Sequence, residues 1–483
     1  MPRAYLGPIP HPAIGIRIPD IVIPPVLKAF KMRGVVGTLM LSYNRETAPS
    51  KIISEGKHIL LGHTGTSIKE YISKALSYAD EFGVLIEVEA DHLSLMSSPE
   101  RAIKRITHGG FEYGLSDEEI KNSLTYIEEE LKEASEAGGI DFVTIDTCEL
   151  VDLSIDKIDE KDLLVRYENE VEEDIRRELE RKYLGRRFRF FLNNGKVFEI
   201  KFKLEDIARL SLKYLKSIEY VIKIYEIVKK YNKREFGVEI AFDELPQVTK
   251  PMELFFYMGE LSSRGLTIDF IAPNIGFAKR EDYNGDLSIL AQRIDTLLAI
   301  TKSFGALLSF HSGSGSHPYS DKGIGVWETI RDASNGMIKY KVSGVYIQLL
   351  LEVMSRFPKG SKVRTTYEEI FDKVLETVKN YVKSKKELYS QELESMINDY
   401  EVLISKSPEK RRDSRIDFFR HYFFLFQAIT NEKGKRYLRD KVIELYNENN
   451  DLRNIYEREA IELTLRIIDK LGFKENYLRF LAK

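Results

Sequence analysis

The chain has 483 residues, enough for two or more domains or for one large barrel with insertions. It is 43% hydrophobic, which allows a sizeable core, and its 73 basic and 76 acidic residues leave a net charge of −3. A charge balance so close to zero favours neither nucleic acid nor an anionic membrane as a partner.

The N-terminal sequence MPRAYLGPIPHPAIG carries proline and glycine where a signal peptide needs a continuous apolar run. No stretch approaches the roughly 18 apolar residues that a membrane span needs. The chain has one cysteine, Cys148, so it forms neither an intramolecular disulfide nor a cysteine-based zinc site. We interpret this cysteine as a packing residue rather than a nucleophile, and we expect a soluble cytoplasmic protein.

From about residue 35, short apolar runs alternate with stretches whose apolar residues recur at helical spacing. The runs predicted to be strands are GVVGTLMLSYN (34–44), KHILLGHTG (57–65), GVLIEVEADH (83–92), GIDFVTIDT (139–147), GVEIAFDE (237–244), LTIDFIAPN (266–274) and GALLSFHSG (305–313). FEYGL (111–115) is a weaker candidate, and MIKYKVSG (337–344) is the last strand-like pattern. Helix starts are predicted at Ser98-Pro99-Glu100 and at Ser116, which forms a capping box with Glu119.

Strands that alternate with helices indicate parallel strands in βα units, and their number approaches the eight of a (β/α)₈ barrel. The first predicted strand does not open into GxGxxG, so a dinucleotide-binding fold has no support. We therefore predict an α/β protein with a TIM-like (β/α)₈ barrel.

Two regions interrupt this alternation. Residues 150–235 are highly charged and contain an Asn193-Asn194-Gly195 turn that predicts a hairpin, so we interpret them as an insertion between two barrel strands. After about residue 366 the pattern becomes helical, which predicts a barrel-like domain over 1–365 and a helical C-terminal region over 366–483. We expect the aromatic run FFRHYFFLF (418–426), with His421, to form helix core.

Polar side chains end several predicted strands. In a parallel barrel the active site lies at the carboxyl ends of the strands. The strand ends supply Asp91, His92, Asp146, Asp243, Glu244, Asn274 and His311. The chain has only 8 histidines, yet two of these strands end in one. Imidazole and carboxylate ligands suit a divalent zinc, manganese, iron, cobalt or nickel ion, so we expect a metal site there.

The loop that follows His311 reads SGSGS (312–316). Glycine and serine let backbone N–H groups approach an anion closely, and Lys322 would add a positive charge. GHTGTS (62–67) is a second loop of this kind. Neither loop matches GxxxxGK[ST] or GxSxG, which argues against a nucleotide site and a serine-hydrolase site. A sugar carboxylate or a phosphate would suit either loop.

An ordered set of short motifs extends from about residue 84 to residue 320. In chain order the motifs are Ala90-Asp91-His92, Thr144-Ile145-Asp146, Phe242-Asp243-Glu244, Thr249-Lys250-Pro251, Ser263-Arg264-Gly265, Ile271-Ala272-Pro273, Asp282-Tyr283-Asn284-Gly285-Asp286 and His311-Ser312-Gly313-Ser314. This set resembles the tagaturonate/fructuronate epimerase family. The resemblance implies a metal-dependent, barrel-like isomerase that interconverts two keto-hexuronates in hexuronate catabolism.

The chain departs from the pattern of that family at two places. Residues 315–320 separate His311-Ser312-Gly313-Ser314 from Asp321-Lys322, and Asn274 stands where the pattern predicts arginine. Both places are expected substrate contacts, so these departures bear on the identity of the substrate more than on the metal.

Tagaturonate and fructuronate differ at C4, which is β to the ketone, so abstraction of an α-proton cannot invert that carbon. Transient oxidation of C4 would need a nicotinamide, for which the chain offers no fingerprint. Retro-aldol cleavage of C3–C4, rotation of the aldehyde and re-addition would need a Lewis acid and groups that take and return the hydroxyl proton.

The resemblance and the strand-end positions together assign roles to these residues. His92 and His311 would bind the metal, with Asp243 or Asp146 as the third ligand, and Glu239 ranks lower because it lies deeper in its strand. Asp91 and Glu244 would be the catalytic acid and base. The expected substrate contacts are Ser312, Ser314, His317, Lys322 and Asn274. Another metal-dependent sugar isomerase or aldolase on the same barrel, or a non-catalytic sugar-acid binding protein, stays open, and so does the oligomeric state.

Overall fold

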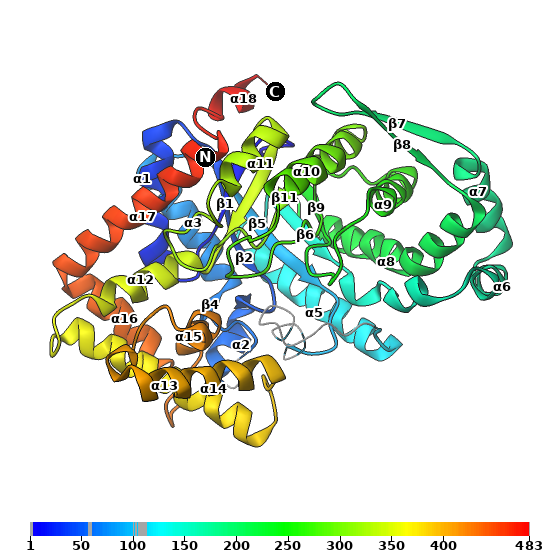
Figure 1. Cartoon of the computed structure of the whole chain (residues 1–483). Helices are drawn as coiled ribbons and strands as arrows, with labels where there is room; N and C mark the ends of the chain where they lie inside the picture. The colour runs from blue at the N-terminus through cyan, green and yellow to red at the C-terminus, as the bar shows by residue number, and fades with distance from the viewer. Residues whose placement is uncertain (1–2, 57–59, 100, 102–103, 105–113, 483) are drawn as a thin grey trace.

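Eight parallel strands close into a barrel in the computed structural model, which describes residues 3–56, 60–99, 101, 104 and 114–482 (Figure 1). Around the barrel the strands follow the order β1-β12-β11-β10-β9-β6-β5-β2, so neighbours in sequence are neighbours in the barrel. The strands are β1 (His11–Gly15), β2 (Gly37–Ser42), β5 (Ile86–Ser94), β6 (Phe142–Asp146), β9 (Gly237–Ala241), β10 (Phe270–Ala272), β11 (Leu307–Phe310) and β12 (Ile338–Val342). The predicted TIM-like barrel is confirmed.

A helix follows each barrel strand before the next one begins. These helices are α1 (Pro19–Arg33), α3 (Ile68–Phe82), α5 (Asp117–Glu136), α8 (Leu204–Tyr231), α9 (Pro251–Ser263), α10 (Leu287–Lys302), α11 (Val326–Ser334) and α12 (Val345–Ser355). The predicted capping box at the start of α5 is present, because Ser116 accepts from the backbone of Glu119 and the Glu119 carboxylate accepts from the backbone of Ser116. Ser98 likewise accepts from the backbone N–H of Arg101 at 3.2 Å, whereas Glu100 lies outside the described residues.

One strand prediction is wrong, and one barrel strand was not predicted. The run KHILLGHTG is not a barrel strand: residues 60–65 form turns, and only β4 (Thr66–Ser67) pairs, with β3 (Thr47–Ala48). Instead, HPAIG (11–15) is the first barrel strand and pairs with β2 and β12. Pro12 inside this strand hid it, because proline normally argues against a central strand. The candidate FEYGL falls mostly outside the described residues.

The segment between β6 and β9 forms a lobe on one side of the barrel (Figure 1). It contains two short 3₁₀ helices (Cys148–Leu150 and Leu153–Lys157), the helices α6 (Glu160–Glu170) and α7 (Glu173–Tyr183), and the strands β7 (Arg187–Phe191) and β8 (Val197–Lys201). The antiparallel pairing of β7 with β8 confirms the hairpin predicted at Asn193-Asn194-Gly195. Helix α8 ends this segment and packs against β6, α5 and α9, as a helix of the outer ring does.

The chain after α12 is helical, on the side of the barrel away from the hairpin (Figure 1). Its elements are α13 (Lys362–Ser384), α14 (Gln391–Lys406), a 3₁₀ turn (Pro408–Lys410), α15 (Asp417–Tyr422), the 3₁₀ helix η4 (Phe423–Gln427), α16 (Tyr437–Glu448), α17 (Asn450–Leu471) and α18 (Tyr477–Leu481). Helix α17 packs against α1, α11 and α12 of the outer ring. The division of the chain at residue 365 stays a prediction.

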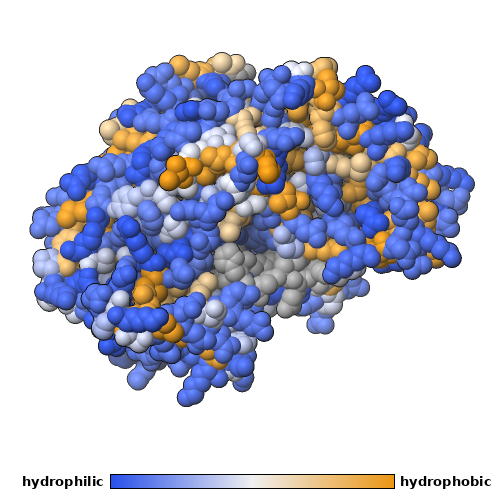
Figure 2. All heavy atoms as spheres, viewed as in Figure 1, coloured by the Kyte–Doolittle hydropathy of each residue, from blue (hydrophilic) through white to orange (hydrophobic). Residues whose placement is uncertain are grey.

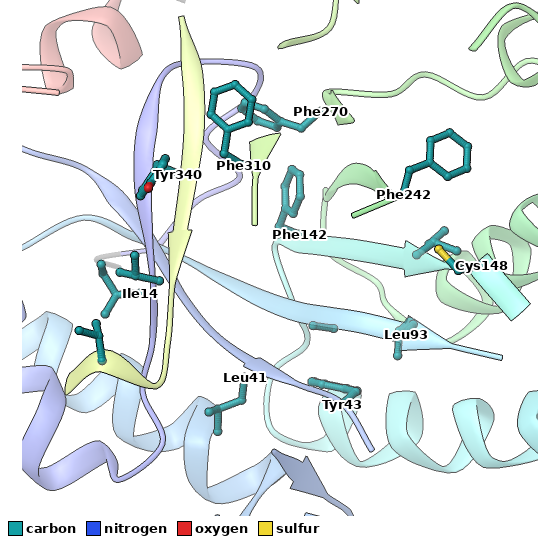
Figure 3. Packing of buried hydrophobic residues seen from close by; sticks show 14 of the residues in the cluster. Ile14, Leu41, Tyr43, Leu93, Phe142, Cys148, Phe242, Phe270, Phe310 and Tyr340 are labelled. Atoms are coloured by element: carbon teal, nitrogen blue, oxygen red, sulfur yellow. The ribbon is translucent and has the colours of Figure 1, made fainter. Parts of the chain in front are cut away.

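Most buried apolar residues from the strands and the surrounding helices form a continuous core (Figure 3), and Leu6, Ile9 and Val36 form a separate small cluster. Phe142, Phe270 and Phe310 belong to the continuous core, and Cys148 is buried among the same residues. The short helix α2 (Ser50–Glu55) lies between β3 and β4 in the chain. Hydrophilic residues cover most of the face seen in Figure 2. No helix among the described residues has the length and apolar character that crossing a membrane requires.

Candidate active site and metal centre

A cavity opens at the carboxyl ends of the barrel strands, where active sites of this fold lie. Six of the ten predicted site residues line it: Asp91, His92, Asp243, His311, Ser312 and Ser314. The strand ends therefore bring together the two histidines that are far apart in the sequence. Their rings meet edge to face with centroids 5.0 Å apart.

Asp91 and His92 both line the cavity although neighbouring residues of a strand normally point to opposite faces. The register between β5 and β6 shifts between Ala90 and Leu93, and His92 has a φ of 49°. Such a bulge re-aims side chains and often lies next to an active site. The bulge thus explains how one strand supplies two adjacent polar groups to the same cavity.

A similar backbone feature follows the other histidine. Ser312, which comes directly after His311, has a φ of 55°, a conformation that costs free energy for any residue with a Cβ. Gly313 packs so tightly that a Cβ there would lie 2.5 Å from the carbonyl oxygen of Lys341. The chain therefore turns sharply after His311, and Ser312 and Ser314 line the cavity beside it.

Each histidine is held by a carboxylate. The Nδ1 atom of His92 lies 3.3 Å from Oδ2 of Asp146. The Nε2 atom of His311 lies 2.5 Å from Oε1 of Glu239, and its Nδ1 atom lies 2.9 Å from Oδ1 of Asp243. A carboxylate on one ring nitrogen fixes the orientation of a metal-binding histidine. Asp146 and Glu239 are placed to do this.

Lys341, at the end of β12, joins the carboxylates inside the barrel. Its Nζ atom lies 2.5 Å from Glu89, 2.8 Å from Asp91 and 2.8 Å from Glu239. Lys339 lies two residues before Lys341 on the same strand, and its Nζ atom lies 2.7 Å from Oε2 of Glu89. All of these side chains are buried, so each charge depends on the others for compensation.

Glu244 lies between two cations. Its Oε1 atom accepts from Arg45 at 2.6 Å and from Lys279 at 2.8 Å. Arg45 and Lys279 line the cavity, and the neighbouring Asp243 lines it as well.

The pKa values of two site carboxyls, those of Asp91 and Asp243, follow from contacts with charged neighbours. Burial would raise the pKa of Asp91, but Lys341 and the two histidines hold it well below its ordinary value.

The same balance acts on the pair of Asp243 and His311. Burial raises the pKa of the Asp243 carboxyl, but His311 outweighs it and lowers the value to about 2. Burial lowers the pKa of His311, but Asp243 and Glu239 outweigh this and raise it to about 9. These pKa shifts favour an ionised Asp243 carboxylate and a protonated His311 imidazole.

The donor atoms fit a divalent cation. Asp91, His92 and His311 each offer one ligand atom, and these three atoms lie within 4.8 Å of one another. His92, Asp243 and Glu244 form a second group of this kind, so His92 belongs to both. Oδ2 of Asp243 is buried and accepts no hydrogen bond from any described residue. Imidazole nitrogen and carboxylate oxygen are common ligands of divalent transition metals.

Three predicted substrate contacts lie away from this cavity. Lys322 is fully buried, and its ammonium donates to the carbonyl oxygens of Ala278, Glu281 and Ser314 at 2.7, 2.7 and 3.2 Å. His317 lies beside Tyr319 and is not among the residues that line the cavity. The Asn274 side chain donates to the carbonyl oxygen of Leu245 and accepts from the backbone of Gly276. The structure thus gives Lys322 and Asn274 contacts within loops and places all three side chains outside the cavity lining, and their roles in substrate binding stay predictions.

The predicted anion loop GHTGTS (62–67) also lies elsewhere, against the C-terminal region. Arg436 and Arg439 donate to the carbonyl oxygens of His63 and Thr64. Ser67 caps helix α3 by accepting from the backbone of Glu70. The loop thus contributes packing and a helix start.

Sequence reasoning missed five cavity-lining cations. They are Arg17, Arg45, Lys279, Arg280 and Lys341. Arg17 and Arg45 follow β1 and β2, and Lys341 ends β12, so all three obey the strand-end rule. Arg280 lies in the loop after β10, where no periodic pattern marks it.

Comparison with known proteins gives a consistent result. A family model described as UxaE: tagaturonate epimerase matches residues 102–468. The chain is similar to a glycerol complex of the fructuronate-tagaturonate epimerase UxaE from Cohnella laeviribosi, with a TM-score of 0.67 and 20% identity over 98% of this chain and 83% of that chain. The native structure of the same enzyme gives a TM-score of 0.66 at 20% identity with the same coverage. At this identity the structural likeness establishes the fold alone. The search among curated proteins found no match.

Proposed function

The chain belongs to the tagaturonate epimerase family, since the family model spans more than half of it, and we propose that it interconverts tagaturonate and fructuronate by inverting C4 in the barrel cavity. One observation carries this proposal: two histidines and two carboxylates from three strand ends converge in a cavity at the carboxyl end of the barrel. The two sugar acids differ only in the configuration of C4, so the site must handle the hydroxyl proton on that carbon from two sides.

His92, His311 and Asp243 would hold the divalent cation. Asp146 and Glu239 would orient the two imidazoles through the ring nitrogens that they contact. When bound, such a cation supplies Lewis acidity to the ketone of the substrate. The buried position of the ligands keeps them ordered before the substrate arrives.

Asp91 and Glu244 would take and return the hydroxyl proton on C4. Lys341 holds Asp91 ionised, so its carboxylate can accept that proton while the C3–C4 bond breaks and its electron pair moves toward C2. The cleaved aldehyde rotates, C3 attacks its other face, and Glu244, protonated at this stage, donates its proton to the epimeric alkoxide. Before the next turnover Asp91 releases the proton that it took to solvent, and Glu244 regains one from solvent. Arg45 and Lys279 balance the charge on Glu244 between the two events.

An assay of epimerisation tests this function. We expect purified protein to convert tagaturonate to fructuronate with an added divalent metal, and His311→Ala to lose at least about 100-fold in kcat/KM, as loss of a metal ligand does. Lys223→Met, which breaks an exposed ion pair on α8, serves as the control for expression and purification.

Chelation separates the metal from the rest of the proposal. Extensive treatment with a chelator should abolish turnover, and a divalent metal should restore it. Full wild-type activity after chelation would exclude the metal role, whereas absence of epimerisation at every metal tested would exclude the function. Release of free aldehyde as the main product would indicate an aldolase instead.

A further inference from the structure

Five cationic side chains line the cavity, and four of them form ion pairs with carboxylates. Arg17 forms an ion pair with Glu46, and Lys341 forms one with Asp91. Glu244 forms ion pairs with both Arg45 and Lys279. The N–O distances of these four pairs are 2.6 to 2.8 Å. Arg280, the fifth, forms no ion pair with a carboxylate among the described residues. It therefore brings a positive charge to the cavity that the surrounding side chains do not compensate.

Arg280 is held in place by the C-terminal region. Its Nη1 atom donates to the carbonyl oxygen of His421, and its guanidinium lies 5.5 Å from the ring centroids of both Phe423 and Phe424. Its own carbonyl oxygen accepts from Arg420 at 2.6 Å. The backbone of Arg280 has a φ of 60°, which costs free energy and persists only where surrounding contacts impose it. These contacts fix a cation at the edge of the cavity, and a fixed group loses little conformational entropy when it binds a ligand.

Arg17 provides a second guanidinium nearby. Its Nε and Nη2 atoms contact Glu46, but its buried Nη1 atom has no hydrogen-bond partner among the described residues. Gly344 makes room for it, since a Cβ at that position would lie 3.2 Å from Nη1. Burial and the charge of Arg17 lower the pKa of Arg280 to about 9, so the two guanidinium groups repel each other. An anion that contacts both would relieve this repulsion.

We propose that Arg280, assisted by Arg17, binds the carboxylate of the sugar acid and so selects uronates over neutral ketoses. This rests on the proposed function, because it concerns the substrate of the same cavity. The planar guanidinium group matches a carboxylate in geometry and charge. Arg45 and Lys279 suit this role less well, because Glu244 already occupies them.

The proposal also gives the C-terminal region a role in the active site. Phe423, Phe424 and the carbonyl group of His421 form the wall on which the Arg280 guanidinium rests. Substrate selection would then depend on residues more than 130 positions away from Arg280 in the chain.

The test compares two ligands that differ in one group. Titration calorimetry on the full-length protein measures the Kd of tagaturonate and of tagatose, in which a hydroxymethyl group replaces the carboxylate. We expect Arg280→Gln to weaken tagaturonate binding by about 10- to 100-fold, the effect of losing a charged hydrogen bond, and to leave tagatose binding nearly unchanged. Arg280→Lys should retain part of the preference because it keeps the charge.

Arg364→Gln is the matched control. Arg364 also donates to a backbone carbonyl, that of Ser355, and lies over an aromatic ring, Tyr367, but it does not line the cavity. We expect it to leave both Kd values unchanged. In steady-state assays, Arg280→Gln should raise KM for tagaturonate more than it lowers kcat.

Three results would overturn the proposal: equal weakening of both ligands in Arg280→Gln, an unchanged preference for tagaturonate in that variant, or a wild-type protein that binds tagatose as tightly as tagaturonate. Tighter binding of tagatose 6-phosphate than of tagaturonate would assign the two arginines to a phosphate instead. Epimerase turnover is measured separately, so a wild-type protein that binds tagaturonate without converting it counts against the proposed function and leaves this binding comparison intact.

Discussion

Lys341 determines the charge balance at the bottom of the cavity. Its single ammonium lies within 2.8 Å of three buried carboxylates, those of Glu89, Asp91 and Glu239. Burial would lower the pKa of Lys341, but these carboxylates raise it well above its ordinary value, so the side chain stays charged. The lysine thus keeps Asp91 ionised and ready to accept a proton.

Replacement of Lys341 by methionine should destabilise the protein by about 3–5 kcal/mol, because it leaves buried carboxylates without their counter-charge. Urea denaturation monitored by circular dichroism measures the free energy of unfolding. Lys223→Met, which breaks an exposed pair with Glu219, is the control and should change stability by less than about 0.5 kcal/mol. A Lys341→Met variant as stable as the wild type would show that the carboxylates find compensation elsewhere.

Site residues could be predicted where a polar residue directly follows an apolar run. Asp91, His92, Asp243 and His311 stand in such positions, and each one lines the cavity. Lys341 was missed because the alternation in IKYKV is typical of a half-exposed strand, whereas both of its lysines are buried in the barrel. Conversely, the position of Lys322 after a glycine-rich loop predicted an exposed side chain that binds an anion. Its buried ammonium instead donates to three carbonyl oxygens.

At the scale of whole elements, the strand pattern predicted seven of the eight barrel strands, including MIKYKVSG as the last one. The exception is β1, in which proline masks a short strand. The apolar run in KHILLGHTG was wrongly predicted to be a strand. Its apolar residues at 60–61 instead precede a glycine-rich turn that packs on the C-terminal region. Short apolar runs do not distinguish a strand from a buried loop, because both bury their side chains.

Strand β5 carries a buried acid at the end of the barrel opposite the cavity. Glu87 accepts from the backbone N–H of Leu6 at 2.9 Å and from the Thr38 hydroxyl at 2.8 Å. Burial raises the pKa of Glu87 to about 8, although Lys339 and the Leu6 hydrogen bond act in the other direction. The folded protein therefore holds this proton at pH values where the unfolded chain has released it.

This proton makes stability depend on pH. Between the unfolded pKa of 4.5 and the folded pKa of about 8, the folded state binds more protons, so the contribution of Glu87 is fully present below pH 4.5 and is lost as pH rises. The free energy of unfolding should fall by about 1.4 kcal/mol per pH unit from this group. Glu87→Gln should remove that slope, and urea denaturation between pH 5 and pH 8 measures it. Equal slopes in Glu87→Gln and wild type would contradict the prediction, with the exposed Glu118→Gln as the control.

At the scale of the whole molecule, the C-terminal region contacts both ends of the barrel. Near the cavity, Arg420 donates to the carbonyl oxygens of Arg280 and Ser316. At the other end, Asn476 accepts from the backbone N–H of Val36 and donates to the carbonyl oxygens of Val36 and Pro10. Between them α17 covers α1, α11 and α12. The sequence could indicate that this region is helical, but its contacts join residues more than 400 positions apart, which no local pattern encodes.

These contacts predict that a chain ending at residue 365 will not fold alone. Truncation would expose the apolar faces of α1 and α12 that α17 covers, and it would leave buried backbone groups at Pro10 and Val36 without partners. We expect such a chain to be sensitive to proteases and to unfold without a cooperative transition. Co-expression with residues 366–483 should restore a cooperative transition, because the two pieces share the interface that α17 forms. Cooperative thermal unfolding of the 1–365 chain by itself would instead make residue 365 a true domain boundary, and it would mean that the outer ring of the barrel is stable without α17.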